Sequence, residues 1–213
     1  MKVKIKKKGK KKNYNLITSW ADVTLEKWIK IIAAQTGTKT KEARETIAAM
    51  SDIPKPLINE MSLKDVAVIM GKLSEIQAQK DTKLKKIIEL DGLQYAFHPN
   101  LDDITLGEYA DLENFIKIGI DKSMPEIMAV LFRPIVEQEK DIYSIAAYDG
   151  NITIRAEKMK QMSAEQVQSA LVFFWNFVIE LSKILPSFLV ERTQEIAKSF
   201  QTKTSQKSGG GSE

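Results

Sequence analysis

The chain has no cysteine and only one histidine among its 213 residues. Without cysteine it can form neither a disulfide framework nor a thiolate metal site, which fits a reducing compartment. The single histidine, His98, precedes Pro99 at the end of a predicted strand and has no cysteine to work beside. The common pairs of nucleophile and base therefore have no obvious members, and we expect His98 to be a turn or surface residue.

Other signatures of chemistry are also missing. The sequence contains no phosphate-loop, dinucleotide-binding or zinc-ligand spacing. Neighbouring carboxylates such as Asp102 and Asp103, or Glu137 and Glu139, show no sign that burial would perturb them. Arg133 lies at a predicted helix end, where an arginine can satisfy carbonyl groups. We therefore predict a protein that is not an enzyme, with no catalytic residue, no metal site and no cofactor.

Long hydrophobic runs are also lacking. A helix that crosses a membrane needs about 20 apolar residues, and the most apolar segment, from Ser163 to Leu181, is interrupted by Asn176 and Glu180. The lysines at the beginning of the chain are not followed by the apolar region of a signal peptide. We expect no membrane partner.

Positive charge is concentrated at the beginning of the chain. The first twelve residues hold eight lysines and no acid, so the formal net charge of +4 becomes −4 for residues 13–213. Val3 and Ile5 alternate with lysines and Tyr14 resumes the alternation after Gly9, which predicts a hairpin with a solvated lysine face. The alternative is an arm that contacts nucleic acid or a partner in a salt-dependent way. Its candidate contact residues are Lys6, Lys7, Lys8, Lys10, Lys11 and Lys12.

One sequence motif, which we name the phrase, occurs twice. Residues 22–28, Asp-Val-Thr-Leu-Glu-Lys-Trp, return as residues 103–109, Asp-Ile-Thr-Leu-Gly-Glu-Tyr. Each copy follows an alternating apolar segment, and before the second copy Asp91-Gly92 separates two such segments, which favours a type I′ hairpin turn. The repetition predicts that a hairpin followed by helices is used twice. Such a repeat is an architectural device rather than a reaction centre.

Both copies carry helix-start signals. Thr24 and Thr105 can each accept a backbone N–H at the start of a helix, and Glu108 completes a capping box with Thr105. Ser163 starts a later helix in the same way. The aspartate two residues before each threonine favours the positive end of the helix dipole. The alternative is that these two aspartates form a catalytic pair. Capping, however, explains both why the residue is an aspartate and why it lies two positions before the threonine.

Helical periodicity dominates the rest of the chain, and its apolar stripes are expected to be core. The segment from Glu137 to Asp141 is expected to be a polar loop. Beyond the helices that follow each phrase, we predict helices over Lys39–Met50, from Ser62 to Ile76, over Met124–Arg133 and over Ile154–Met162.

The predicted helix that begins at Ser163 is apolar nearly all round. We expect it to be a central core helix. If one subunit cannot bury all of its aromatic side chains, the surplus would form an exposed patch and hence a subunit interface. The candidate interface residues are Phe173, Trp175 and Phe177.

Together these patterns predict an α+β fold, mainly α-helical, with two short β-hairpins each followed by helices and the C-terminal apolar helix central to the core. Residues 1–80 would form the first hairpin-plus-helices unit and residues 81–140 the second. Residues 141–200 would be a C-terminal helical segment that packs on both, and residues 201–213, rich in Gly and Ser, a flexible tail. A single globule is favoured because neither copy alone would bury much apolar surface.

The order of the motifs along this chain resembles that of a known group of proteins. The order runs from the lysine-rich hairpin through residues 19–25 (Ser-Trp-Ala-Asp-Val-Thr-Leu) and the second phrase at 103–109 to residues 128–135 (Met-Ala-Val-Leu-Phe-Arg-Pro-Ile) and Met162 to Leu181. It is similar to that of small virion-associated or tail-assembly proteins of tailed bacteriophages, including crAss-like phages and others of gut Bacteroidetes. The resemblance covers most of residues 3–185, and its motifs are structural, so no active residue carries over.

The resemblance implies a non-enzymatic protein that is either a structural component of the virion, associated with the head, neck or tail, or a tail-assembly factor. Its expected partners are other phage structural proteins and copies of itself, and its expected location is the virion or the host cytoplasm during phage assembly. The alternative function is a nucleic-acid-binding module that uses the lysine-rich N-terminal arm.

Overall fold

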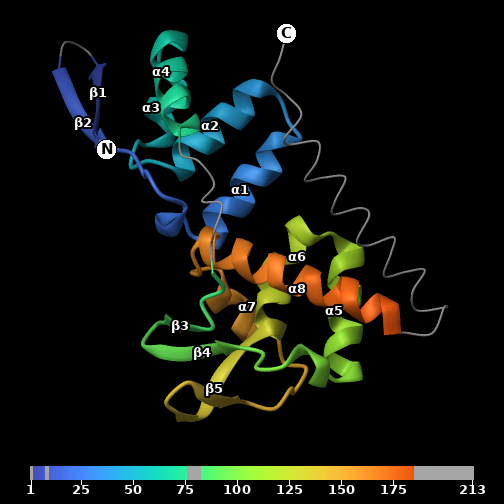
Figure 1. Ribbon diagram of the computed structural model, residues 1–213. Helices are drawn as coiled ribbons and strands as arrows, with labels where there is room; N and C mark the ends of the chain where they lie inside the picture. Colours follow the sequence, from blue (N-terminus) through green and yellow to red (C-terminus); the bar gives the residue numbers. More distant parts are fainter. Residues whose placement is uncertain (1, 8–9, 76–82, 185–213) are drawn as a thin grey trace.

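The computed structural model describes residues 2–7, 10–75 and 83–184. Helices predominate over two small antiparallel sheets, so the predicted α+β, mainly helical fold is confirmed. The first half, residues 2–75, lies above the second half, residues 83–184, in Figure 1. Each half is built around its own cluster of buried hydrophobic side chains.

The first half begins with the predicted hairpin. Strands β1 (Lys2–Lys7) and β2 (Lys10–Asn15) pair antiparallel, with Val3 opposite Tyr14. Val3, Ile5 and Tyr14 are buried while Lys2 and Lys4 are exposed, because successive side chains of a strand point to opposite faces. The solvated lysine face is thereby confirmed for these two lysines. Lys8 and the side chains of Lys6, Lys7, Lys10 and Lys11 lie outside the part that the structure describes.

Helices complete the first half. A short 3-10 turn, η1 (Trp20–Asp22), leads into the first of them. Thr38 and Ser62 accept the N–H groups of Lys41 and Asp65, and so start two of these helices. The helices are α1 (Leu25–Gln35), α2 (Lys39–Ala49), α3 (Lys55–Asn59) and α4 (Leu63–Ser74). The predicted link from Gln77 to Thr82 lies outside the described residues.

The second half begins with the second predicted hairpin, β3 (Ile87–Leu90) and β4 (Leu93–Phe97). Its turn residues Asp91 and Gly92 have φ values of 51° and 74°, the left-handed conformation that a type I′ turn requires. A 3-10 turn, η2 (Leu101–Asp103), and helix α5 (Leu106–Ile118) follow.

The two copies of the phrase therefore adopt the same succession of strand, 3-10 turn, threonine cap and helix. The Lys27 N–H donates to Thr24 Oγ1 over 3.4 Å, and the Glu108 N–H donates to Thr105 Oγ1 over 3.3 Å. Glu108 completes the capping box by accepting the Thr105 N–H. These caps were predicted from the sequence and are confirmed.

A third hairpin was not predicted. Strands β5 (Phe132–Glu139) and β6 (Ile142–Ile145) extend the sheet to the order β3-β4-β5-β6, so the expectation of a polar loop over Glu137–Asp141 was wrong. Pairing of β5 with β4 directs the chain outward as a strand, and Lys140, with a φ of 55°, makes the turn. The preceding helix, α6 (Ile120–Leu131), accordingly ends before Arg133.

The last two described helices are α7 (Thr153–Met159) and α8 (Ala164–Ile184). Ser163 Oγ accepts the N–H of Gln166 over 3.1 Å, which confirms its predicted role as a cap. As predicted, α8 is central to the second core, to which it contributes the buried residues Val167, Ala170, Leu171, Phe174, Trp175 and Val178. Within the described chain, no helix is long and apolar enough to cross a membrane.

The start of α8 also joins the two halves. The Leu25 N–H donates to the Met162 carbonyl and the Ala164 N–H donates to the Val23 carbonyl, each over 2.7 Å. Leu25 belongs to the core of the second half, whereas Ala164 belongs to that of the first. The two cores therefore interlock where the first copy of the phrase meets the end of α7. The predicted tail, residues 201–213, lies outside the described residues, as do residues 185–200.

Candidate functional site

An open groove of about 420 Å³ lies in the second half, between α8 and the link that joins β4 to α5. Most of its lining is apolar, and its polar side chains come chiefly from the link. The lining residues are Leu84, Lys86, Phe97, His98, Pro99, Asn100, Leu101, Asp102, Phe173, Asn176 and Phe177. We name this site the groove.

Aromatic side chains give the groove its apolar character. The Phe97 ring meets the Phe173 ring edge to face, with centroids 5.9 Å apart. Phe173 is 50% exposed and Phe177 is half-buried. Trp175, by contrast, is only 5% exposed and belongs to the core, because residues two apart on a helix point in nearly opposite directions. Of the three candidate interface residues, the structure therefore brings Phe173 and Phe177 together and places Trp175 elsewhere.

The link that forms one wall of the groove is held by short-range hydrogen bonds. The Asn100 side chain accepts the Asp102 N–H over 3.2 Å and donates to Asp103 Oδ2 over 2.9 Å. At the start of the link, the His98 N–H donates to the Leu131 carbonyl over 2.7 Å. The wall is thus anchored both to its own 3-10 turn and to the end of α6.

His98 is one of the lining residues but its side chain is buried, so the expectation of a surface residue was wrong. Its side chain is 7% exposed, and Nε2 lies 3.6 Å from Glu108 Oε1. Burial lowers the pKa of His98 although the Glu108 carboxylate opposes this shift, so the imidazole is neutral at pH 7. No local signal indicated this position, because Glu108 reaches His98 only when the link folds back over α5.

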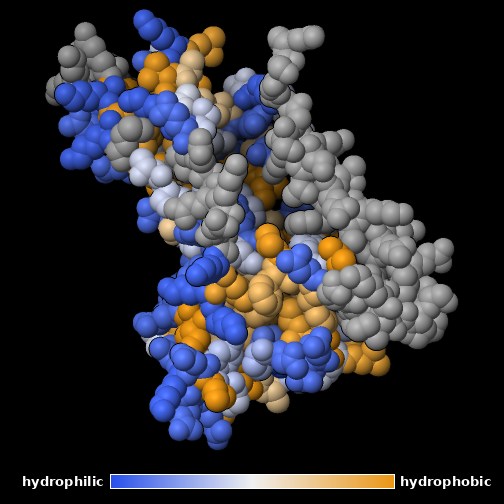
Figure 2. Space-filling model, viewed as in Figure 1, coloured by the Kyte–Doolittle hydropathy of each residue, from blue (hydrophilic) through white to orange (hydrophobic). Residues whose placement is uncertain are grey.

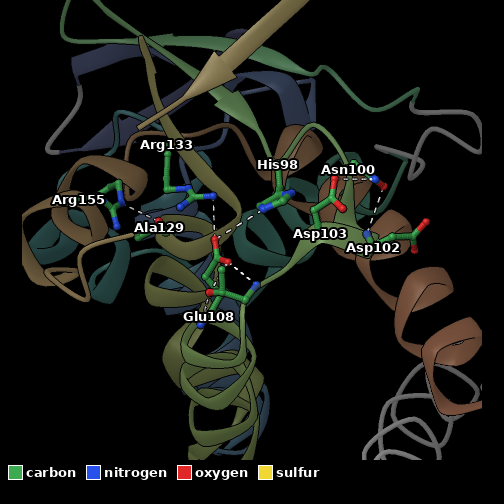
Figure 3. Close-up of polar contacts among 9 residues, drawn as sticks. His98, Asn100, Asp102, Asp103, Glu108, Ala129, Arg133 and Arg155 are labelled. Carbon is green, nitrogen blue, oxygen red and sulfur yellow. Dashed lines mark hydrogen bonds and ion pairs between the residues drawn. The ribbon is translucent and has the colours of Figure 1, made fainter. Parts of the chain in front are cut away.

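Glu108 is the centre of a buried polar cluster, shown in Figure 3. It is 1% exposed, and Arg133, which is 5% exposed, places Nη2 within 2.7 Å of Glu108 Oε1. The other carboxylate oxygen accepts both the N–H and the hydroxyl of Thr105, each over 2.7 Å. The prediction that Arg133 satisfies helix-end carbonyls was therefore wrong, because the buried guanidinium pairs with a carboxylate instead.

Further polar contacts fasten the chain around this cluster. Arg155 Nε donates to the Ala129 carbonyl over 2.6 Å (Figure 3), and the Tyr148 hydroxyl hydrogen-bonds to Asp111. Burial raises the pKa of Tyr148, and its bond to Asp111 adds to the shift. The Arg133 guanidinium lies 5.9 Å from the centre of the Tyr148 ring. The cluster thus ties α5, β5 and the segment before α7 together behind the groove.

The groove offers mainly apolar contacts together with a few polar side chains. Among the groove residues that the structure describes, none carries a hydroxyl or thiol nucleophile, and the carboxylate nearest His98 is already held by Arg133 and Thr105. The described ranges contain no group of three or more His, Cys, Asp or Glu residues placed to hold a metal ion. One signal in the sequence could have revealed the cluster: Arg133 is the only charged residue from 127 to 136, and a charge within an apolar run needs a buried partner.

In comparisons with protein-family models, with curated proteins and with solved structures, nothing matches this chain.

Proposed function

We propose that this chain is a non-enzymatic protein of tailed bacteriophages that acts by packing against other proteins. It is either a component of the virion, in the head, neck or tail, or a tail-assembly factor in the host cytoplasm. The observation that carries the proposal is the groove with Phe173 half exposed at its edge. The similarity of the sequence motifs to phage proteins supports the phage setting.

The groove has the properties of a protein-binding site. Val172, next to Phe173 on α8, is 59% exposed, so apolar surface continues beyond the groove. On the face shown in Figure 2, hydrophobic surface also gathers where α5 and α8 lie. Exposed apolar patches of this kind mark interaction sites, and an aromatic side chain at the edge of a hollow is a typical energetic centre of an interface.

Charge indicates the chemistry of the partner. Asp102 and Lys86 are both exposed in the groove lining, and Asp103 is exposed next to Asp102. Residues 83–184 contain 16 Asp and Glu but only 11 Lys and Arg. We therefore propose that the groove receives a segment of another phage structural protein that presents apolar side chains, with a basic residue toward Asp102 and Asp103.

Mass spectrometry of phage particles and assembly intermediates tests this function, in cells infected by a phage that encodes the chain. We expect the protein in one or both fractions. The Phe173→Asp variant should be incorporated about tenfold less, because the interface would then bury a charge. Leu63→Asp is the matched control, since Leu63 is 87% exposed on α4, away from the groove. Absence of the wild-type chain from both fractions, or equal incorporation of both variants, would contradict the proposal.

The alternative is a nucleic-acid-binding module, favoured by the exposure of Lys2, Lys4 and Lys12 on the first hairpin. Deleting residues 1–12 would not test it cleanly, because Val3 and Ile5 belong to the first core. Replacing Lys6, Lys7, Lys8, Lys10, Lys11 and Lys12 by glutamine removes the candidate contact residues and leaves Val3 and Ile5 unchanged. Fluorescence anisotropy with duplex DNA should show affinity that falls steeply with salt and is lost in this variant. Weak binding at low salt would rule this alternative out.

A further inference from the structure

Charge is divided between the two halves of the molecule. Residues 1–75 contain 16 Lys and Arg against 8 Asp and Glu, whereas residues 83–184 contain 11 against 16. The two halves lie one above the other (Figure 1), so the molecule is positive at one end and negative at the other. A charge distribution of this kind orients molecules as they approach one another.

A hairpin projects at each end. The basic hairpin, β1–β2, lies at the top of Figure 1 and exposes Lys2 and Lys4. The β5–β6 hairpin, which we name the acidic hairpin, lies at the bottom and exposes Glu137, Glu139 and Asp141. The opposite charges thus sit on hairpins at opposite ends of the described chain in this view.

The two hairpins also match in spacing. Lys2 and Lys4 are two residues apart on one strand, as are Glu137 and Glu139, so each pair lies on one face with its members about 7 Å apart. β1 and β6 are edge strands of their sheets, and an edge strand presents backbone N–H and carbonyl groups that another strand can pair with.

Apolar surface at the acidic hairpin adds a reason for contact. Val136 is 64% exposed and Ile142 is 80% exposed. Neither side chain contributes to the core of its own half. A second chain seated on this hairpin would remove both from water.

We propose that copies of this chain associate head to tail, with the basic hairpin of one copy packed on the acidic hairpin of the next. The contact is heterologous, so it builds a ring where the rotation between copies closes and a filament where it does not. The inference rests on the proposed function only in that the chain acts by packing. It uses surfaces distinct from the groove.

Light scattering after size-exclusion chromatography of the full chain gives the first test. At 0.1 M NaCl we expect an average mass at least about twice that of the monomer. At 1 M NaCl the monomer should predominate, because the Debye length falls from about 10 Å to about 3 Å. A wild-type chain that is monomeric at 0.1 M NaCl would overturn the proposal, including one that assembles only when DNA is added.

Charge reversal gives the sharper test. The Lys2→Glu/Lys4→Glu variant and the Glu137→Lys/Glu139→Lys variant should each be monomeric at 0.1 M NaCl, because in each the substituted pair meets a pair of like charge at the contact. Mixing them in equal amounts should restore assembly. Glu89→Lys/Glu157→Lys is the matched control: both residues are exposed and lie outside the basic and acidic hairpins, on β3 and α7, so this variant should assemble like the wild type.

The outcomes separate this inference from the proposed function. Assembly that persists in both hairpin variants, or a mixture that stays monomeric, overturns the head-to-tail contact and leaves the groove untouched. Phe173→Asp should assemble like the wild type in this assay. Loss of assembly in that variant would move the self-contact to the groove and overturn the inference.

Discussion

The two copies of the repeated phrase begin their helices in the same way but lie in opposite environments. Leu25 and Leu106 each follow the capping threonine directly, yet Leu25 is fully buried and Leu106 is 83% exposed. The difference arises because the segment before α8 runs against the first copy, where Met162 accepts the Leu25 N–H. The phrase therefore encodes the start of a helix, and the surrounding chain decides which side chains that helix buries.

The residue at the third helical position also differs between the copies, both in charge and in burial. Lys27 in the first copy is only half-buried, whereas Glu108 in the second copy is buried with Arg133 and His98. Both residues donate their N–H to the capping threonine. In the second copy alone, the side chain at this position also joins distant strands.

The largest expected effect comes from removing the buried carboxylate. Glu108→Ala leaves the Arg133 guanidinium buried without its partner, so we expect a loss of about 3–5 kcal/mol in the free energy of unfolding. Lys27→Ala, the same position in the first copy, should change it by no more than about 0.5 kcal/mol. Urea unfolding followed by circular dichroism measures both. Equal effects would show that Glu108 acts only as a helix-start residue.

The next effect compares the two leucines. Leu25→Ala removes a side chain buried in the second core and should cost about 2–5 kcal/mol. Leu106→Ala should cost no more than about 0.5 kcal/mol, because its side chain is largely in water. The same unfolding assay applies. A costly Leu106→Ala would mean that this leucine is covered in solution, for instance by a second chain.

Removing the capping threonines should change the free energy of unfolding by less, and the two copies should differ less. Thr24→Ala removes one hydrogen bond to the Lys27 N–H and should cost about 0.5–1 kcal/mol. Thr105→Ala should cost about 1–2 kcal/mol, because the Thr105 hydroxyl also donates to the buried Glu108 carboxylate. Thermal unfolding of both variants gives the comparison, with Thr→Ser at each site as the control that keeps the hydroxyl. A larger loss for Thr24→Ala would reverse our ranking.

The smallest effect is a pH dependence confined to the second copy. Burial lowers the pKa of His98 in the folded chain, so below about pH 6.5 the unfolded chain binds a proton that the folded chain does not. The free energy of unfolding should therefore fall as the pH is lowered from about 7.5 to 5.5, by at most about 1.4 kcal/mol over the whole range.

His98→Gln is the variant that isolates this dependence, and the slope in this pH range should be smaller in it. Glu26 and Glu45 do not interfere, because hydrogen bonds to Lys30 and Lys55 lower the pKa of these carboxyls and move their titration to more acidic pH. An unchanged slope in His98→Gln would assign the dependence to another group.

Local patterns account for much of the fold. The Asp91-Gly92 turn, the caps at Thr24, Thr105 and Ser163 and the alternation of Val3 with lysines were all predicted, because each depends on residues within a few positions of one another. The acidic hairpin was missed because its polar residues lack the alternation of a half-buried strand. Its turn uses Lys140 in the left-handed conformation, where asparagine or glycine would have been the usual signal.

The buried cluster was missed for a different reason. The capping box of Glu108 with Thr105 is local and was predicted, but its ion pair with Arg133 joins residues far apart in the chain. His98 enters the same cluster only because β4 pairs with β5, which brings the link against the end of α6. No spacing along the sequence encodes these contacts.

Residue order alone thus specified where the helices with side-chain caps and the first two hairpins begin, since capping, turn geometry and strand alternation act over a few bonds. Only the tertiary structure decided three other features: the exposure of Phe173 beside a groove, the burial of His98 and Glu108 around Arg133, and the opposite positions of the basic and acidic hairpins. These features depend on which surfaces meet when distant segments exclude water together, and that outcome is a property of the whole chain.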